Sequence, residues 1–205
     1  NERIAPMEAQ FEKWCPRLIM VAKNRYTGKV TWTDGKYHEP NIYVKGIEMK
    51  QSRMPKVMKE AMLNTITGIL DGETEDATTE RIADLITSVM GGKTPAKDLC
   101  MKGKIERDLS NYKVLSGSSA GAAWANEFLG KGYRAGSFFL VTLDEDGKYI
   151  AFDDPKEIEG IKNIGVKVLV DRFIIKKISP YYELAGWNTQ PLQNAKNGIG
   201  NISWL

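Results

Sequence analysis

The chain has 205 residues, of which 42% are hydrophobic, and this is enough to bury a core in one or two subdomains. Its two cysteines, Cys15 and Cys100, are too few for a disulfide framework or a cysteine zinc site. No stretch approaches the roughly 20 apolar residues of a membrane span, and no basic and then apolar leader opens the chain, so we expect a protein of the reducing cytoplasm with no membrane partner.

The net charge of +3 is unevenly distributed along the chain. Lys and Arg outnumber Asp and Glu by 12 to 7 in residues 1–70 and by 6 to 3 in residues 91–115, whereas residues 71–90 carry 1 basic and 6 acidic side chains. The basic segments suit contact with phosphate, and the acidic segment is expected to point away from it. Patches of this size are also common on soluble proteins, so that alternative stays open.

The first predicted elements are mainly strands. Residues 11–20 suit a short helix or strand. Residues 29–32 and 42–49 suit strands that flank an Asp34-Gly35 turn and a longer loop with Pro40.

Two amphipathic helices are predicted next. Ser52 can cap the first helix, whose apolar side chains recur every three or four residues, and the second helix is closed by Gly91-Gly92. The apolar stripe of the first helix is Met54, Met58, Ala61, Met62, Ile66 and Ile69, and that of the second is Ile82, Leu85, Ile86, Val89 and Met90.

Beyond Pro95 the pattern favours strands. Residues 138–143 and 148–152 alternate around Asp146-Gly147 and predict a hairpin, and residues 166–170 predict another strand. The Ala-rich residues 120–129 predict a helix between them, and the Asn- and Gly-rich residues 193–205 predict a flexible tail with an apolar tip. The fold class is therefore α+β.

A basic and aromatic quartet, Lys23-Asn24-Arg25-Tyr26, lies at the mouth of the first predicted hairpin. Two long cations and a flat ring with a hydroxyl tip are suited to lying along a duplex groove. Cations reach phosphates and groove acceptors, and a ring packs on sugars. A solvated hairpin end is the alternative interpretation of the quartet taken alone.

The order of further segments makes the chain resemble the family B DNA polymerases. These segments are Val44-Lys45-Gly46-Ile47-Glu48-Met49, Ser52 to Lys59, Leu109-Ser110-Asn111-Tyr112, Gly132 to Gly136, and Val170 to Ile175 with Pro180. The spacing within residues 22–58 is most similar to the T-even-type bacteriophage replicative polymerases. The resemblance implies the end of the palm in residues 1–50, a thumb of helices with a small antiparallel β region in residues 51–192, and a tail in residues 193–205.

Two motifs of that family are absent from the sequence. Neither an Asp-x-x-Ser-Leu-Tyr-Pro block nor a Tyr-x-Asp-Thr-Asp block occurs, and their aspartates are the ones that bind two Mg²⁺ ions. The acidic runs 144–146 and 153–154 lie beside turn residues and are interpreted as solvated hairpin ends. The resemblance therefore implies a chain that binds no cofactor, is not catalytic alone, and serves DNA replication with a larger polymerase chain that carries palm, fingers and Mg²⁺.

The resemblance also implies which residues contact primer-template DNA. Lys23, Arg25 and Tyr26 would lie along the minor groove, and Asn24 departs from the commonest form of the motif, where a second basic residue stands. Further candidates for backbone phosphates are Arg53, Lys56, Lys59, Lys102, Lys104, Ser116, Ser118 and Ser119, although each lysine or arginine among them also suits a plain surface position.

Two other motifs in the sequence match catalytic or nucleotide-binding patterns only in part. Residues 117–121 match the Gly-x-Ser-x-Gly elbow of hydrolases, but the base of that chemistry is a histidine downstream of the serine, and His38 lies upstream in a predicted loop. A helix entry capped by Ser118 or Ser119 is an equally good interpretation of this segment. Gly92-Lys93-Thr94 lacks the earlier glycine of a phosphate-binding loop and is interpreted as a helix stop.

The chain ends in an apolar tip that suits docking on a partner. Ile202, Trp204 and Leu205 are costly to expose, and the resemblance implies that such a tail binds a sliding clamp. Packing of Trp204 on the thumb itself remains the alternative. Two other assignments stay open for the whole chain: a stand-alone duplex DNA-binding or processivity protein, and a domain cut from a single-chain polymerase.

Overall fold

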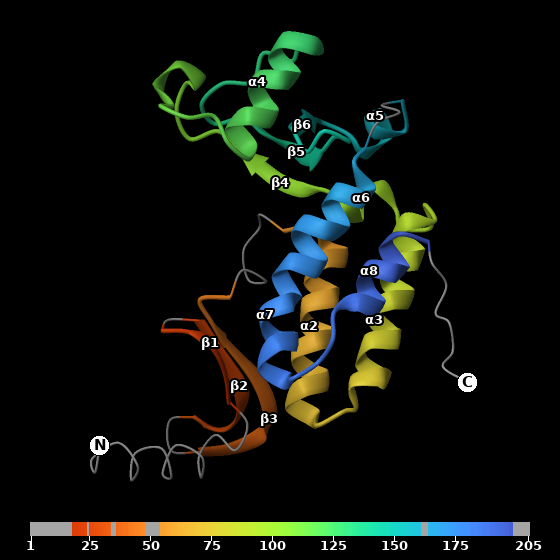
Figure 1. The fold of residues 1–205 in the computed structure, drawn as a ribbon. Coiled ribbons are helices and arrows are strands. Elements are labelled where there is room, and N and C mark those ends of the chain that lie inside the picture. Colours follow the sequence, from red (N-terminus) through yellow and green to blue (C-terminus); the bar gives the residue numbers. More distant parts are fainter. Residues whose placement is uncertain (1–17, 24, 34–35, 48–53, 161–163, 199–205) are drawn as a thin grey trace.

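The computed structural model describes residues 18–23, 25–33, 36–47, 54–160 and 164–198, and it confirms the mixed α and β architecture. A group of helices forms the middle of the molecule, with one three-stranded antiparallel sheet beside it and a second one at its end (Figure 1). We call the unit at the end, residues 100–160, the head.

The first sheet has the strand order β1-β2-β3, with β1 at Leu18–Ala22, β2 at Arg25–Thr33 and β3 at Lys36–Lys45. Both pairs are antiparallel. The loop expected around Pro40 is wrong, because β3 runs through this position. The register of β2 and β3 shifts between Val30 and Trp32, opposite Pro40, and proline is tolerated at such an irregularity because its missing N–H is not needed there.

The two amphipathic helices are confirmed as α2, Lys56–Asp71, and α3, Glu75–Met90. Ser52, the expected cap of α2, lies outside the described residues. Thr74 caps α3 by accepting a hydrogen bond from the Ala77 N–H, and Gly91 follows its last residue. The methionine stripe of α2 is core packing, as expected, since Met54, Met58, Ala61, Met62 and Ile66 are all buried.

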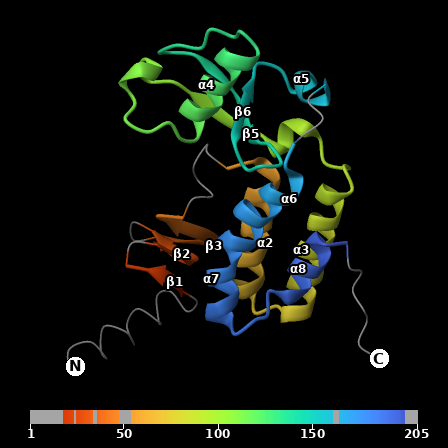
Figure 2. The ribbon, with the colours of Figure 1, turned by 45° about the horizontal axis from the view of Figure 1, so that its top comes forward.

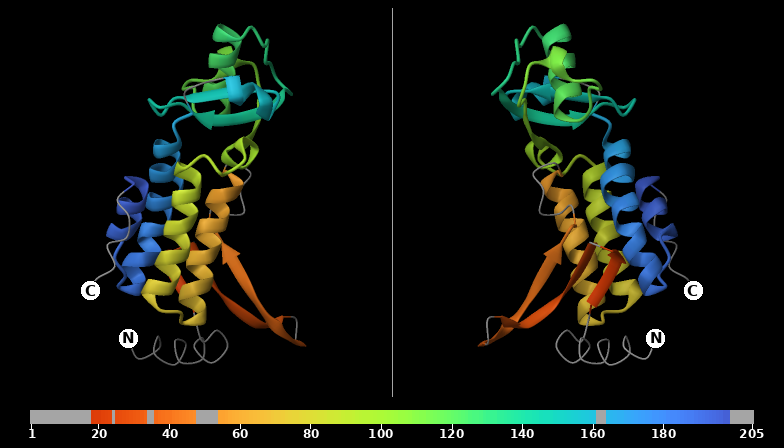
Figure 3. Two further views of the ribbon diagram at one scale, coloured as in Figure 1. Left: turned by 90° about the vertical axis from the view of Figure 1, so that its right-hand side faces the viewer. Right: turned by 90° about the vertical axis from the view of Figure 1, so that its left-hand side faces the viewer.

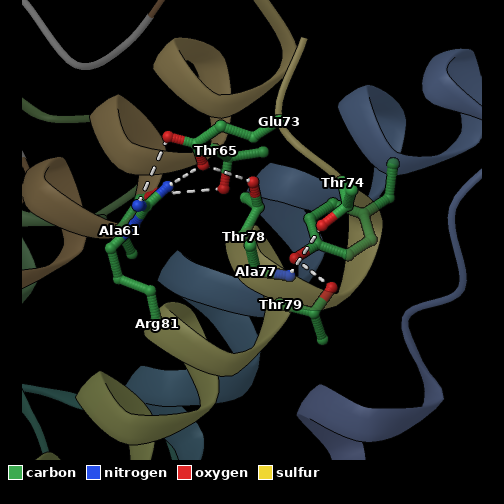
Figure 4. Close-up of polar contacts among 9 residues, drawn as sticks. Ala61, Thr65, Glu73, Thr74, Ala77, Thr78, Thr79 and Arg81 are labelled. Carbon is green, nitrogen blue, oxygen red and sulfur yellow. Dashed lines mark hydrogen bonds and ion pairs between the residues drawn. The ribbon is translucent and has the colours of Figure 1, made fainter. Parts of the chain in front are cut away.

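The turn between α2 and α3 is held by polar contacts (Figure 4). The Glu73 carboxylate accepts hydrogen bonds from the Arg81 guanidinium and from the Thr78 hydroxyl. The hydrogen bond from Arg81 and then that from Thr78 lower the pKa of Glu73. Lys29 of β2 forms an ion pair with Asp71, so the first residue of the acidic segment lies where the first sheet meets the end of α2.

We expect Tyr182→Phe to lower the free energy of unfolding by about 1 kcal/mol. Tyr182 is fully buried, its hydroxyl lies 3.1 Å from the Thr79 hydroxyl, and phenylalanine would leave Thr79 without this partner. Urea unfolding of the two proteins measures the difference. Tyr149→Phe is the matched control, because the Tyr149 hydroxyl makes no hydrogen bond within the described part of the chain. Equal losses in both variants would contradict the prediction.

The head contains the second sheet, of strand order β4-β5-β6, and two helices. The expected hairpin is confirmed, since Leu143 of β5 pairs with Tyr149 of β6 across the Asp146-Gly147 turn. Helix α4 packs on the sheet at Gly121, where an added Cβ would lie 3.2 Å from the Cβ of Ala151. The bounds are η2 Ala96–Leu99 just before the head, then β4 Met101–Lys104, η3 Leu109–Asn111, α4 Ser118–Phe128, β5 Phe138–Leu143, β6 Tyr149–Phe152 and α5 Pro155–Gly160.

The strand expected at residues 166–170 is wrong. The chain is helical from α6, Val166–Leu169, through the π-helical turn η4, Val170–Ile175, into α7, Lys176–Ala185. Apolar residues recur along this segment at helical spacing, and their burial against α2 outweighs the strand preference of the β-branched residues. The buried set is Leu169, Val170, Phe173, Ile174, Ile175, Ile178, Tyr181 and Tyr182.

The last described helix, α8, spans Gln190–Lys196 and packs on α3. The predicted flexible tail therefore does not begin at residue 193, since residues 193–196 are helical. Leu192 is fully buried, and the Lys196 ammonium donates to the Asp171 carboxylate at 2.9 Å, which fastens α8 to η4.

The head covers one end of the helices in every view (Figures 1 and 2). The first sheet and α8 lie on opposite sides of α2 and α3 (Figure 3). Lys56, at the start of α2, forms an ion pair with Asp98 of η2, so the start of α2 lies beside the entry to the head.

Candidate nucleic-acid interface

The quartet lies at the open end of the β2-β3 hairpin, as predicted, and it also forms the tight connection from β1 to β2, which the sequence did not predict. Ala22 pairs with Arg25 across this tight connection, which leaves Lys23 in the turn and exposed. Arg25 is exposed and Tyr26 is half-buried. Asn24 lies outside the described residues. The structure therefore brings two cations and a ring together at one end of the first sheet.

Strand pairing adds Lys45 to this group, and the predicted site residues do not include it. Lys45 is the cross-strand partner of Tyr26, and its ammonium lies 5.6 Å from the centroid of the Tyr26 ring. On the same sheet the Tyr43 ring lies 6.2 Å from that of Tyr26. Lys45 belongs to the Lys45-Gly46 segment already noted in the sequence, but its place over the ring follows only from the register. We call Lys23, Arg25, Tyr26 and Lys45 the hairpin patch.

The predicted cations of the first long helix lie on a different element from the hairpin patch. Lys56 is the first residue of α2, and its side chain is 75% exposed although it faces Asp98 at 3.6 Å. Lys59 is half-buried one turn further along. Arg53 lies outside the described residues. Lys56 thus lies beside the entry to the head, and both lysines belong to the first turn of α2.

A second group of predicted residues comes together in the head. Lys102 and Lys104 of β4 and the serines at the start of α4 line one cavity of about 510 Å³, which we call the head cavity. Its full lining is Met101, Lys102, Lys104, Glu106, Tyr112, Ser116, Gly117, Ser118, Ser119, Val141 and Tyr149. Five of the predicted site residues, separated by up to 17 positions in sequence, therefore share one concave surface.

The three serines of the head cavity differ in what their hydroxyls can do. Ser119 is buried, and its hydroxyl donates to the Ser116 carbonyl and accepts from the Ser116 N–H, both at 3.0 Å. It is therefore neither placed to donate to a phosphate nor free to act as a nucleophile. Ser118 is half-buried and makes no side-chain hydrogen bond within the described residues. The residue that precedes α4 is Gly117, with φ of 53°, so neither serine is its cap.

Two cations that lie in or near the cavity lining pair with aromatic rings, and the predicted site residues do not include these rings. The Lys104 ammonium lies 5.4 Å from the centroid of the Phe138 ring, its cross-strand neighbour. The Arg107 guanidinium lies 4.5 Å from the centroid of the Tyr112 ring. The basic residues of segment 91–115 were a signal for this surface, and Tyr112 lies in the same segment, whereas Phe138 joins it from β5 through strand pairing.

One acidic pair has a structural role that differs from the expected one. Asp153 is exposed, as expected, but it also accepts hydrogen bonds from the Lys131 ammonium at 2.9 Å and from the hydroxyl of the buried Tyr133 at 2.7 Å. The bond from Lys131 and then that from Tyr133 lower the pKa of Asp153, while burial and then the bond to Asp153 raise that of Tyr133. Together they hold the loop after α4 against β6. The run 144–146 does lie at a turn, where Asp144 accepts from the Lys148 N–H.

The described residues offer neither a metal site nor a membrane span. They contain no group of three or more His, Cys, Asp or Glu side chains that could hold a metal ion. No helix among them is both long and apolar enough to cross a membrane. The hairpin patch and the head cavity are thus the surfaces on which the predicted site residues gather.

Comparison with known proteins gives two matches. The family model described as DNA polymerase family B matches residues 2–123, a range that holds the hairpin patch, α2, α3, β4 and the start of α4. A DNA polymerase of Thermococcus aggregans is 25% identical over 109 residues, which is 53% of this chain. The matched part spans about 6% of the length of that relative.

Proposed function

This chain belongs to DNA polymerase family B, and from that premise we propose that it is the thumb, with the last piece of the palm, of a replicative DNA polymerase. In this proposal it holds the primer-template duplex. The aspartates that bind Mg²⁺ lie on a larger chain with palm and fingers, because the two family blocks that carry them do not occur in this sequence.

The hairpin patch is the observation that carries the proposal. It lies within residues 2–123, which match the family model. Its three cations are exposed, and strand pairing brings them together with the ring of Tyr26. Lys23 and Arg25 can reach phosphate oxygens and groove acceptors, and Tyr26 can pack on a sugar while its hydroxyl donates or accepts a hydrogen bond. This chemistry binds a duplex without reading its sequence.

Contacts of this kind can also sense errors. The minor groove presents the N3 and O2 acceptors at every base pair, and correct pairs present them in the same place. A mismatch displaces these acceptors. Donor groups of the hairpin patch, which the sheet holds in fixed positions, then lose contact with the displaced acceptors. In the proposal the hairpin patch therefore holds a newly made duplex more tightly when its last pairs are correct.

Further parts of the proposal go beyond the family. We propose that the polymerase is of the T-even bacteriophage type, that it acts in the cytoplasm of the host cell, and that the tail residues Ile202, Trp204 and Leu205 bind a sliding clamp. The spacing within residues 22–58 supports the first point, and the apolar tip of the tail supports the last. These three tail residues lie outside the described part of the chain.

We expect Lys23→Ala and Tyr26→Ala each to weaken binding of a primer-template duplex by about 1 kcal/mol or more, roughly fivefold in Kd. Each change removes a direct contact of the hairpin patch. The Kd is measured by fluorescence anisotropy with a labelled primer-template at fixed salt, because the phosphate contribution to binding depends on salt.

Lys93→Ala is the matched control for charge, since Lys93 is an exposed lysine with no ion pair in the described part of the chain and lies beyond the end of α3. Tyr26→Phe separates the hydroxyl from the ring. Circular dichroism confirms that each variant keeps the fold. Unchanged duplex affinity in both alanine variants would show that the quartet is only a solvated hairpin end.

A further inference from the structure

The head cavity lies in a different part of the molecule from the hairpin patch, and its chemistry suits a different form of DNA. We propose that it binds an unpaired nucleotide of single-stranded DNA, with the phosphate at the lysines of β4 and the base on the ring of Tyr112. This inference rests on the proposed function and adds a second ligand to it. The cavity volume of about 510 Å³ is within the range of pockets that hold small molecules.

The charge of the cavity lining favours a phosphate. Lys102 and Lys104 are exposed residues of β4, and neither forms an ion pair with any described residue. Glu106 is the single acidic residue of the lining, so the two ammonium groups outnumber the carboxylate. The half-buried Ser118 hydroxyl adds a donor on the same surface.

Tyr112 supplies a flat ring that is held in place from several directions. The Arg107 guanidinium lies 4.5 Å from the centroid of its ring, and its hydroxyl accepts a hydrogen bond from the Glu106 N–H at 3.4 Å. The side chain is also partly buried against the core. A ring fixed in this way loses little conformational entropy when a base stacks on it.

Exposed apolar side chains next to the cavity favour an unpaired strand over a duplex. Val114 is 76% and Phe138 is 71% exposed, and Leu115 is 43% exposed immediately before Ser116 of the lining. In a duplex the base faces are stacked on each other and only phosphates, sugars and groove edges are accessible. Cations interleaved with rings and apolar groups are the arrangement that binds single strands without sequence preference.

The test compares three labelled DNA probes by fluorescence anisotropy at fixed salt. They are an oligo(dT) strand of about twelve nucleotides, the same strand with abasic sites throughout, and a blunt hairpin duplex. We expect the wild-type chain to bind oligo(dT) about five- to a hundred-fold more tightly than the abasic strand, because stacking on Tyr112 requires a base.

Variants assign this difference to the cavity. Tyr112→Leu is expected to lower the oligo(dT) affinity to that of the abasic strand and to leave the duplex affinity unchanged, while Tyr112→Phe, which keeps a ring, retains it. Replacing Lys102 and Lys104 together by Gln is expected to weaken binding of both single strands. Lys156→Gln, an exposed lysine of the head outside the cavity lining, is the matched control and is expected to change nothing.

The outcomes separate this inference from the proposed function. Equal wild-type affinity for oligo(dT) and the abasic strand, no measurable binding of oligo(dT), or an oligo(dT) affinity that Tyr112→Leu leaves unchanged in a folded protein would overturn the inference. Lys23→Ala and Tyr26→Ala are expected to lower only the duplex affinity. If they do not, while Tyr112→Leu acts as described, the duplex role of the hairpin patch fails and the single-strand site stands.

Discussion

Purified alone and supplied with Mg²⁺, primer-template DNA and all four nucleotides, the chain is expected to incorporate no nucleotide. Mixing it with a chain that carries the two missing aspartate blocks is expected to restore primer extension. The reason is the chemistry of the reaction: nucleotidyl transfer in this family needs paired carboxylates that hold two Mg²⁺ ions at the attacking and leaving oxygens. The sequence lacks both blocks that supply them.

Gel analysis of a labelled primer measures this difference, with the chain alone, the partner alone and the mixture as the three samples. The mixture made with Tyr26→Ala serves as a second comparison, since a weaker hold on the duplex should shorten the products without abolishing them. Incorporation by the pure chain alone would contradict the prediction. A mixture no more active than the partner alone would instead favour a stand-alone duplex-binding or processivity protein.

Deleting residues 201–205 is expected to abolish stimulation of the assembled enzyme by its sliding clamp and to leave distributive synthesis unchanged. Ile202, Trp204 and Leu205 gather large apolar side chains within a short polar and glycine-rich stretch. Short segments of this kind bind by inserting such side chains into a preformed pocket, and a single buried tryptophan can dominate the affinity.

Product length with and without the clamp, under single-hit conditions, measures the effect of the deletion. Ser203→Ala is the matched control within the same segment, because it removes a small polar group and keeps the three apolar anchors. Trp204→Ala is expected to reproduce most of the effect of the deletion. Full clamp stimulation after the deletion would mean that the tail is not the anchor and that Trp204 has another place in the chain.

Elements whose signal is local were predicted well from the sequence. The stripes of α2 and α3 repeat every three or four residues, and such a period can be read within one helix. The β5-β6 hairpin was equally clear, because Asp146-Gly147 is a turn dipeptide between alternating segments. The place of the quartet at the open end of the β2-β3 hairpin belongs to the same class of local prediction.

The wrong predictions share a different cause. The strand preference of the β-branched residues at 166–170 is a weak local effect, and burial of Leu169 and Val170 against the other helices outweighs it. Pro40 suggested a loop, yet a register shift between β2 and β3 accommodates it within a strand. In both places the deciding interaction lies on another element, which no local pattern contains.

The sequence by itself determined the residue types of the candidate site: a Lys, an Arg and a Tyr at one hairpin, and lysines and serines further along the chain. It also determined the absence of the two aspartate blocks, because a motif is a property of consecutive letters. The tertiary structure alone decided which of these residues meet. Lys45 lies over Tyr26 because of strand register, and Lys102, Lys104 and Ser118 share a cavity because β4 pairs with β5 and α4 packs on the same sheet. Contacts between residues so far apart in sequence depend on long-range packing, and the free energy of that packing is distributed over the whole core.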